Sequence, residues 1–123
     1  MGFLSKYSSQ ILGITRIVAG LAFLEHGTMK ILGFPPGMHP PLMSMGGAAG
    51  MIELVAGTLI VLGLFSRCAA FIASGEMAFA YFIGHAPRAL FPAQNGGDAA
   101  ILFCFLFLYL AAAGPGSFAV NSK

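Results

Sequence analysis

The segment GLAFLEHGTMKILGF, residues 20–34, carries an acid, a base and a cation within an otherwise apolar stretch. Glu25, His26 and Lys30 can each donate or accept a proton, and such groups act as acids or bases toward a molecule held within hydrogen-bonding reach. Two further glutamates, Glu53 and Glu76, also lie in strongly apolar segments. The chemistry open to this set is the binding of a small polar group and the exchange of protons with it.

The composition indicates what surrounds these groups. Hydrophobic residues make up 58% and charged residues 8% of the 123 residues, and the mean hydropathy is +0.87. Ordinary soluble domains have roughly 45–50% and about 25%, and a chain of this size could not hide so much apolar surface in one core. The sequence therefore predicts a single-domain integral membrane protein whose first partner is the lipid bilayer. The net charge of +2 is scattered, which does not favour binding to nucleic acid.

Four segments approach the roughly 20 apolar residues that a membrane span requires. They cover about residues 11–31, 47–65, 69–84 and 99–113, and all seven prolines lie outside them. Two long loops, residues 32–46 and 85–98, alternate with one very short link, so consecutive spans should be antiparallel. We therefore expect an all-α membrane protein, an up-down-up-down bundle of four transmembrane helices with both termini at one face and both long loops at the other.

Basic residues near the span ends are more frequent at the terminal face than at the long-loop face. The positive-inside rule then places the N- and C-termini in the cytoplasm. The basic residues are Lys6, Arg16, Arg67 and Lys123 at the terminal face, and Lys30 and Arg88 at the long-loop face.

The polar groups concentrate at the end of the bundle beneath the two long loops. A charge within a membrane costs about 2.5–3.5 kcal/mol on insertion scales, so such groups should face the interior and find partners there. We therefore predict a polar intramembrane pocket under the long loops. Its candidate ligand-binding residues are Glu25, His26, Lys30, Glu53, Glu76, His85, Asn95 and Asp98.

The similar depth of Arg16 and Glu76, on helices that run in the same direction, predicts a structural ion pair between them. Simpler interpretations stay open for the other groups. Glu25, His26 and Lys30 could instead lie at the membrane interface and hold the depth of the helix. Glu53 and Glu76 could serve only as interhelical hydrogen-bonding groups.

Small residues recur at seven-residue intervals in the first two spans. Such stripes allow close helix–helix contact in lipid, so we interpret them as packing seams. They are Gly13, Gly20 and Gly27 in the first span, and Ala49, Ala56 and Gly63 together with Gly50 and Gly57 in the second.

No signature of a known enzyme class appears, and the sequence leaves open whether the protein is catalytic. There is no H-E-x-x-H, G-x-S-x-G or phosphate-binding loop. Only His26 and His85 could be argued as a haem ligand pair, and the spacing favours neither a haem nor a metal site. Cys68 and Cys104 form no metal-ligand or redox pattern and are interpreted as packing residues.

Several motifs in order resemble the DoxX family of small bacterial membrane proteins with four helices. They are "R…G…F.EHG..K..GF" in the first span, "GMIELVAGTLIVLGLFSR" in the second, "GEMAFAYFIGHAPR" in the third and "NGGDAAILFCFLFLYLAAAGPG" in the fourth. The family's recurrent polar positions fall on Arg16, His26, Gly27, Lys30, Glu53, Glu76, His85, Arg88, Asn95 and Gly96. The resemblance implies the bacterial cytoplasmic (inner) membrane and association with quinone-linked redox systems.

The leading hypothesis is a membrane subunit of a quinone-linked or redox-associated complex that binds a quinone-like molecule in the polar pocket. Other membrane redox proteins, or further copies of this chain, would be its partners. The alternative is a non-catalytic scaffold or assembly protein of a membrane complex, in which buried polar groups only specify helix pairing. A small-molecule transporter is the third hypothesis, and four short helices would need several copies to enclose a pore.

Overall fold

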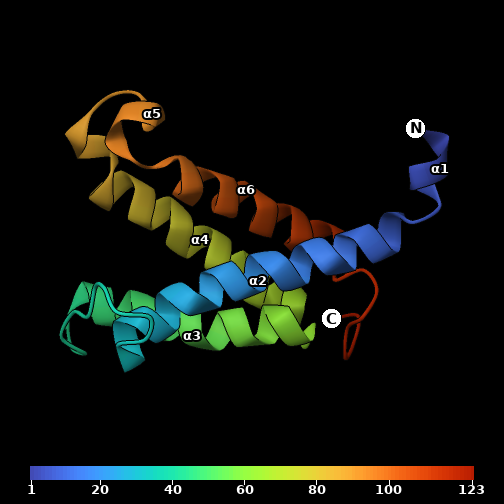
Figure 1. Ribbon diagram of the computed structural model, residues 1–123, viewed down its shortest axis with the longest axis horizontal. Helices are drawn as coiled ribbons and strands as arrows, with labels where there is room; N and C mark the ends of the chain where they lie inside the picture. Colours follow the sequence, from blue (N-terminus) through green and yellow to red (C-terminus); the bar gives the residue numbers. More distant parts are fainter.

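The computed structural model describes the whole chain, residues 1–123, and is helical throughout with no strands (Figure 1). Four long helices and three single-turn elements follow one another. In chain order they are α1 (Gly2–Ser5), α2 (Ser8–Leu32), α3 (Met45–Leu62), α4 (Ser66–Gly84), η1 (Ala86–Arg88), α5 (Pro92–Asn95) and α6 (Asp98–Ala113).

The helix ends follow local sequence signals. Gly33 ends α2 with a left-handed backbone (φ 74°), and Gly63 ends α3 in the same way (φ 69°). The side chain of Ser44 accepts a hydrogen bond from the backbone N–H of Gly47 and so caps the start of α3. The predicted second segment continued to Phe65 and was too long, because Gly63 terminates the helix first. Residues 66–68, predicted as the link, instead form the first turn of α4.

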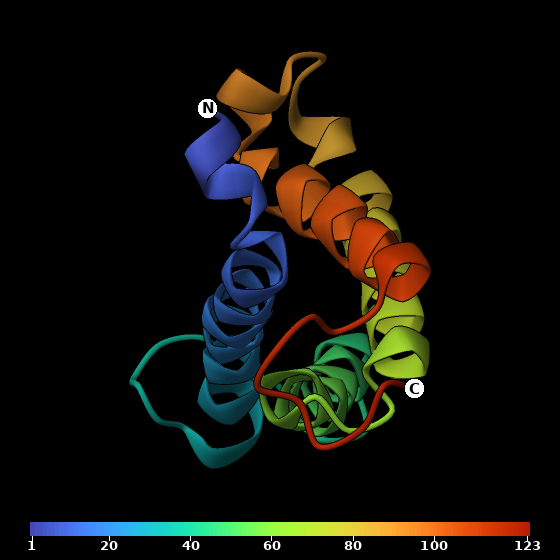
Figure 2. The same ribbon diagram turned by 90° about the vertical axis from the view of Figure 1, so that its right-hand side faces the viewer.

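Consecutive long helices run antiparallel, and both chain termini lie at the end opposite the two long loops (Figure 1). Helix α2 packs on α3, α3 on α4, and α4 on α6. Viewed from the terminal end, α2 lies to one side of α3, and α4 and α6 lie to the other (Figure 2). Phe23 of α2 contacts Phe103 and Phe107 of α6, with ring centroids 6.1 and 4.9 Å apart, and these rings fill the core between the two helices.

Glycines form the seam between α2 and α3, as the seven-residue spacing predicts. A Cβ atom at Gly27 would lie 2.5 Å from the backbone nitrogen of Leu54, and one at Gly57 would lie 2.9 Å from the Cα of Leu24. At Gly20 it would lie 2.9 Å from the side chain of Val61. Gly13 differs, because it lies against the backbone of Ser117 in the C-terminal segment. The two helices therefore approach closely at Gly27 and Gly57, where the backbone of one helix lies against the other.

The same substitution at two helical glycines should have opposite effects. Gly27→Ala should destabilise the protein by about 1–3 kcal/mol, because the added methyl group meets the α3 backbone. Gly75→Ala on α4 adds its methyl group to open space and should be neutral or stabilising by up to about 1 kcal/mol. Unfolding in mixed micelles with increasing SDS would measure both. Equal losses of stability in the two variants would contradict the close contact of α2 and α3 at Gly27.

The outer surface of the bundle is apolar. On α6, Leu102 is 70% exposed and Phe105 is 64% exposed, and the helix has no polar face after Asp98. Exposed large hydrophobic side chains also cover α2, α3 and α4. A helix that is apolar all round is expected in a bilayer or in the core of a large protein. This chain is too small to form such a core.

By length and composition, α2 and α3 could each cross a membrane. Helix α4 has 19 residues, and α6 is apolar with 16 residues, so it is shorter than a typical span. The crossing of the membrane by all four helices stays a prediction.

Candidate functional site

A buried ion pair joins α2 and α3 near the long-loop end. The Nζ atom of Lys30 lies 3.0 Å from both carboxylate oxygens of Glu53 and donates a hydrogen bond to Oε2. Glu53 is 2% exposed and the Lys30 side chain 15% exposed. The pair can form because Gly50, one turn before Glu53, lets α3 approach the base of the Lys30 side chain. The lysine is thus held by the helix that carries its partner.

Glu76 of α4 completes a cluster of two acids and one cation. Its carboxyl group lies close enough to Glu53 and Lys30 for direct electrostatic interaction. Both of its oxygens are buried; the carboxyl group lies beside that of Glu53, with which it can share a proton, and no donor from any other residue reaches it. Buried polar atoms are nearly always paired, so an unpaired carboxyl group calls for an explanation. We refer to Lys30, Glu53 and Glu76 as the Lys–Glu–Glu cluster.

Two cavities border this cluster. The first, of about 590 Å³, lies between α3 and α4 and includes Glu76 in its wall; we call it the α3–α4 cavity. The second, of about 340 Å³, includes Glu53 and residues of all four long helices; we call it the central cavity. Lys30 and His85 line both. The two acids therefore face different cavities while they interact with each other.

Asn95 and Tyr81 hold His85 in place. The backbone oxygen of Asn95 lies 3.1 Å from Nδ1 of His85, and the ring of Tyr81 stacks on the imidazole with centroids 6.4 Å apart. The Asn95 side chain donates to the Tyr81 hydroxyl and to the oxygen of Ala89, and it accepts from Gly97. Because a carbonyl can only accept, Nδ1 must carry the proton, which leaves Nε2 as an acceptor in the neutral ring.

The structure brings together five of the eight residues predicted for the pocket. His26 lines the central cavity, and Lys30, Glu53, Glu76 and His85 line one or both cavities. The other three predicted residues do not line either cavity. Asn95 is buried but acts through His85, while Glu25 and Asp98 are exposed.

Sequence reasoning missed two parts of the cavity walls. Arg88 of η1 lines the α3–α4 cavity, although it was assigned only to the basic residues and the family pattern. Met38 in the first long loop lines both cavities, and its type and position carried no signal of this.

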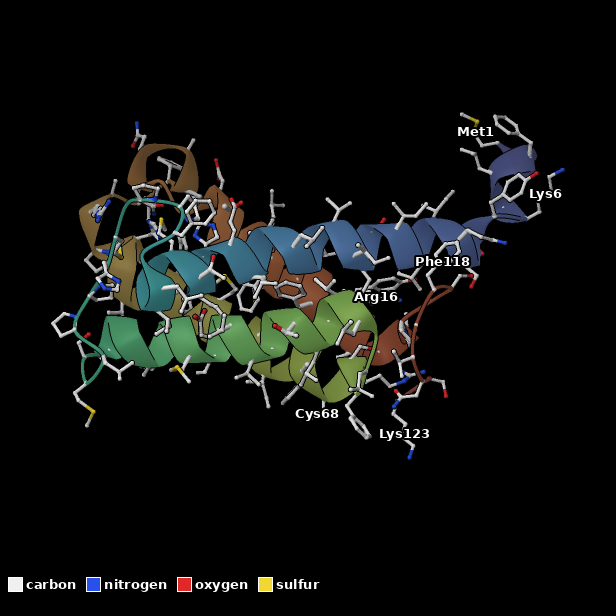
Figure 3. The ribbon with its side chains drawn as sticks, turned by 60° about the horizontal axis from the view of Figure 1, so that its bottom comes forward. Met1, Lys6, Arg16, Cys68, Phe118 and Lys123 are labelled. Atoms are coloured by element: carbon white, nitrogen blue, oxygen red, sulfur yellow. The ribbon has the colours of Figure 1, made fainter.

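The predicted ion pair between Arg16 and Glu76 does not form. Arg16 is 0% exposed and donates to backbone oxygens only: Ile60 at 2.9 Å, Ser117 at 3.0 Å, Phe118 at 2.7 Å, and Pro115. Figure 3 shows Arg16 and Phe118 near the end of the molecule that holds Met1 and Lys123. The irregular C-terminal segment, residues 114–123, has free carbonyl groups there, whereas Glu76 is directed toward the long-loop end.

Further hydrogen bonds tie the C-terminal segment across the terminal end. The N–H of Ser117 donates to the oxygen of Ser9, and the N–H groups of Val120 and Asn121 donate to Leu62 and Gly63. The segment therefore bridges the start of α2 and the turn between α3 and α4.

An apolar exterior around a small buried ionic cluster defines a helical protein embedded in a membrane. The chain belongs to the DoxX family, whose model matches residues 11–86, a range that includes the whole Lys–Glu–Glu cluster. It is 43% identical over 130 aligned residues to an uncharacterized protein of Haemophilus influenzae, with 100% of this chain and 97% of the relative covered. No solved structure matches the chain.

Proposed function

We propose that this protein crosses the bacterial cytoplasmic membrane with α2, α3, α4 and α6 and binds a quinone-like molecule as the membrane subunit of a redox-associated complex. The head group of that molecule would occupy the α3–α4 cavity. The observation that carries the proposal is the buried Glu76 carboxyl group, which lines this cavity and meets no hydrogen-bond donor of the chain apart from the neighbouring acid Glu53. A bound hydroxyl group would supply the missing donor.

The other polar groups of the cavity suit the same ligand. Arg88 and Lys30 offer N–H donors, and the Nε2 atom of His85 offers an acceptor when the ring is neutral. A wall with both donors and acceptors fits a molecule that alternates between carbonyl and hydroxyl oxygens, as quinones and quinols do. The remaining wall is mostly hydrophobic, which is typical of sites for small organic ligands.

The orientation of the site follows from the charge distribution. Cytoplasmic termini would place the two cavities in the outer half of the bilayer, beneath the long loops.

Glu76→Met tests the proposal because ligand binding and a purely structural role predict different results. Removing a hydrogen bond between the ligand and the Glu76 carboxyl group should weaken quinone binding about 5–100-fold, from roughly 1–3 kcal/mol. Exchanging a buried, unpaired acid for an apolar group of similar volume should leave stability unchanged or raise it. Binding of a menaquinone or ubiquinone analogue to protein in nanodiscs would be measured beside its unfolding in SDS.

Glu25→Gln is the matched control, because Glu25 is exposed and lines neither cavity. Its affinity for the quinone should equal that of the unchanged protein. Absence of binding at every quinone concentration would overturn the proposal. Copurified redox enzymes without any bound small molecule would then favour the scaffold alternative.

A further inference from the structure

An apolar groove continues the α3–α4 cavity toward the terminal end. It has a volume of about 350 Å³, and all nine residues that line it are hydrophobic. Ile52 and Ile72 line both the groove and the cavity, so the two adjoin each other at these residues. The groove opens on the outer surface, since Val55 and Cys68 in its walls are exposed. Figure 3 shows Cys68 toward the end of the molecule that holds Lys123.

Together the cavity and the groove extend along most of the α3–α4 interface. On α3 they run from Met45 to Leu59, which is about 21 Å of helix. The end beneath the long loops carries Lys30, Glu76, His85 and Arg88, and the remainder is apolar. This distribution has the shape of a site for an amphiphile, with a polar head at one end and an apolar tail along the other.

Two glycines of α4 keep the cavity wall open. A Cβ atom at Gly75 or Gly84 would meet no atom within 4 Å, and neither residue has a positive φ. Neither backbone conformation nor contact with another helix therefore requires glycine there, in contrast to Gly27 and Gly57 on the α2–α3 seam. Glycine in a helix is less favourable than alanine by about 1 kcal/mol. At Gly75, which lies within the helix, the open space therefore comes at a cost in stability, as expected if a ligand fills it.

We infer that the α3–α4 interface is the lateral path by which a single-tailed quinone enters from the bilayer, and that its tail lies in the apolar groove. This inference rests on the proposed function for the position of the head group. Lipid is as apolar as the groove, so the tail gains little free energy by entering it. The groove acts instead by leaving room for a tail while the head reaches Glu76. A phospholipid fits less well, because Lys30 is already paired with Glu53 and only Arg88 of the cavity wall remains for its phosphate.

A tryptophan in the groove should distinguish the contribution of the quinone tail to binding from that of the head group. Val55→Trp narrows the groove without adding atoms to the α3–α4 cavity, because Val55 lines only the former. It should weaken binding of a quinone with a long isoprenoid tail about 10-fold or more, which is about 1.4 kcal/mol. Binding of the same quinone without a tail should be unchanged. Val18→Trp is the control, since Val18 is exposed on α2 and lines neither space.

A second measurement does not depend on the fold of a variant. A quinone analogue with a photoreactive group at the end of its tail would be bound to the unchanged protein in nanodiscs and irradiated. Adducts should concentrate on α3 and α4 residues of the groove, such as Leu59 and Cys68. Adducts spread evenly over the exposed apolar residues of all four long helices would overturn the inference.

The outcomes separate the two proposals. If neither quinone binds the unchanged protein, the proposed function fails. If both bind but Val55→Trp affects neither, and the adducts lie outside the groove, the head group site stands and the lateral path is wrong.

Discussion

Replacing Arg16 by leucine should destabilise the protein by about 3–5 kcal/mol, because it leaves several buried carbonyl groups without a donor. Arg16 serves the oxygens of Ile60, Pro115, Ser117 and Phe118 at once. The loss should be partial in Arg16→Lys, because a single ammonium group has three donors on one atom and cannot span four acceptors as the guanidinium does. The C-terminal segment should detach first, since three of the four acceptors belong to it.

Unfolding in SDS and the rate of carboxypeptidase digestion would measure these effects. Arg67→Leu is the matched control: Arg67 also donates to backbone oxygens, at Ala111, Ala112 and Ser122, but its side chain is exposed. Exposed hydrogen bonds are replaced by bonds to water, so its loss should be much smaller. Equal losses at the two arginines would show that the burial of Arg16 contributes nothing.

Replacing Lys30 by methionine should destabilise the protein by about 3–5 kcal/mol, since breaking a buried ion pair leaves an uncompensated buried charge. Here two carboxyl groups, of Glu53 and Glu76, would face each other without a cation. Glu53→Leu should be milder, because Lys30 remains beside Glu76. The double variant Lys30→Met/Glu53→Leu should recover most of the stability that Lys30→Met alone loses.

A double-mutant cycle in SDS unfolding would test this coupling between the two residues. Lys6→Met provides the control, because Lys6 is exposed outside the long helices. Additive losses at Lys30 and Glu53 would mean that the two residues contribute independently, and would contradict the predicted coupling. Recovery in the double variant would show that the loss in Lys30→Met comes from the uncompensated charge of Glu53.

The stabilising contacts and the candidate site lie at opposite ends of the molecule. The Arg16 contacts tie the C-terminal segment to the terminal end, and the Lys–Glu–Glu cluster with its cavities lies beneath the long loops. Variants of Arg16 should therefore reduce stability without a specific effect on quinone affinity. Variants of Glu76 should reduce quinone affinity without reducing stability.

The positions of the helices could be predicted because their causes are local. Apolar runs, prolines outside them and glycines at their ends act within a few residues, and the observed bounds of the long helices lie within three residues of the predicted ones. Depth counted along the helices also predicted that Lys30, Glu53 and His85 gather at one end. Helix rise is constant, so depth can be counted from sequence.

The partners of the charges could not be predicted in the same way. Depth placed Arg16 beside Glu76, but the C-terminal segment returns across the terminal end and supplies the acceptors instead. An irregular segment has no repeating sequence pattern, so its path through space cannot be predicted from the sequence. Glu25 and Asp98 were likewise placed in the pocket by depth alone, whereas the rotation and packing of α2 and α6 leave both exposed.

The sequence by itself determined a helical, apolar chain with a few polar groups near one end, because hydrophobicity and helix formation depend on each residue and its near neighbours. Only the tertiary structure decided that Lys30 pairs with Glu53, that Glu76 is left unpaired in a cavity, and that a groove continues from it. The glycines illustrate this difference. Gly27 lies against the backbone of α3, whereas Gly75 faces open space. What faces each glycine depends on how the helices pack, and no local pattern records it.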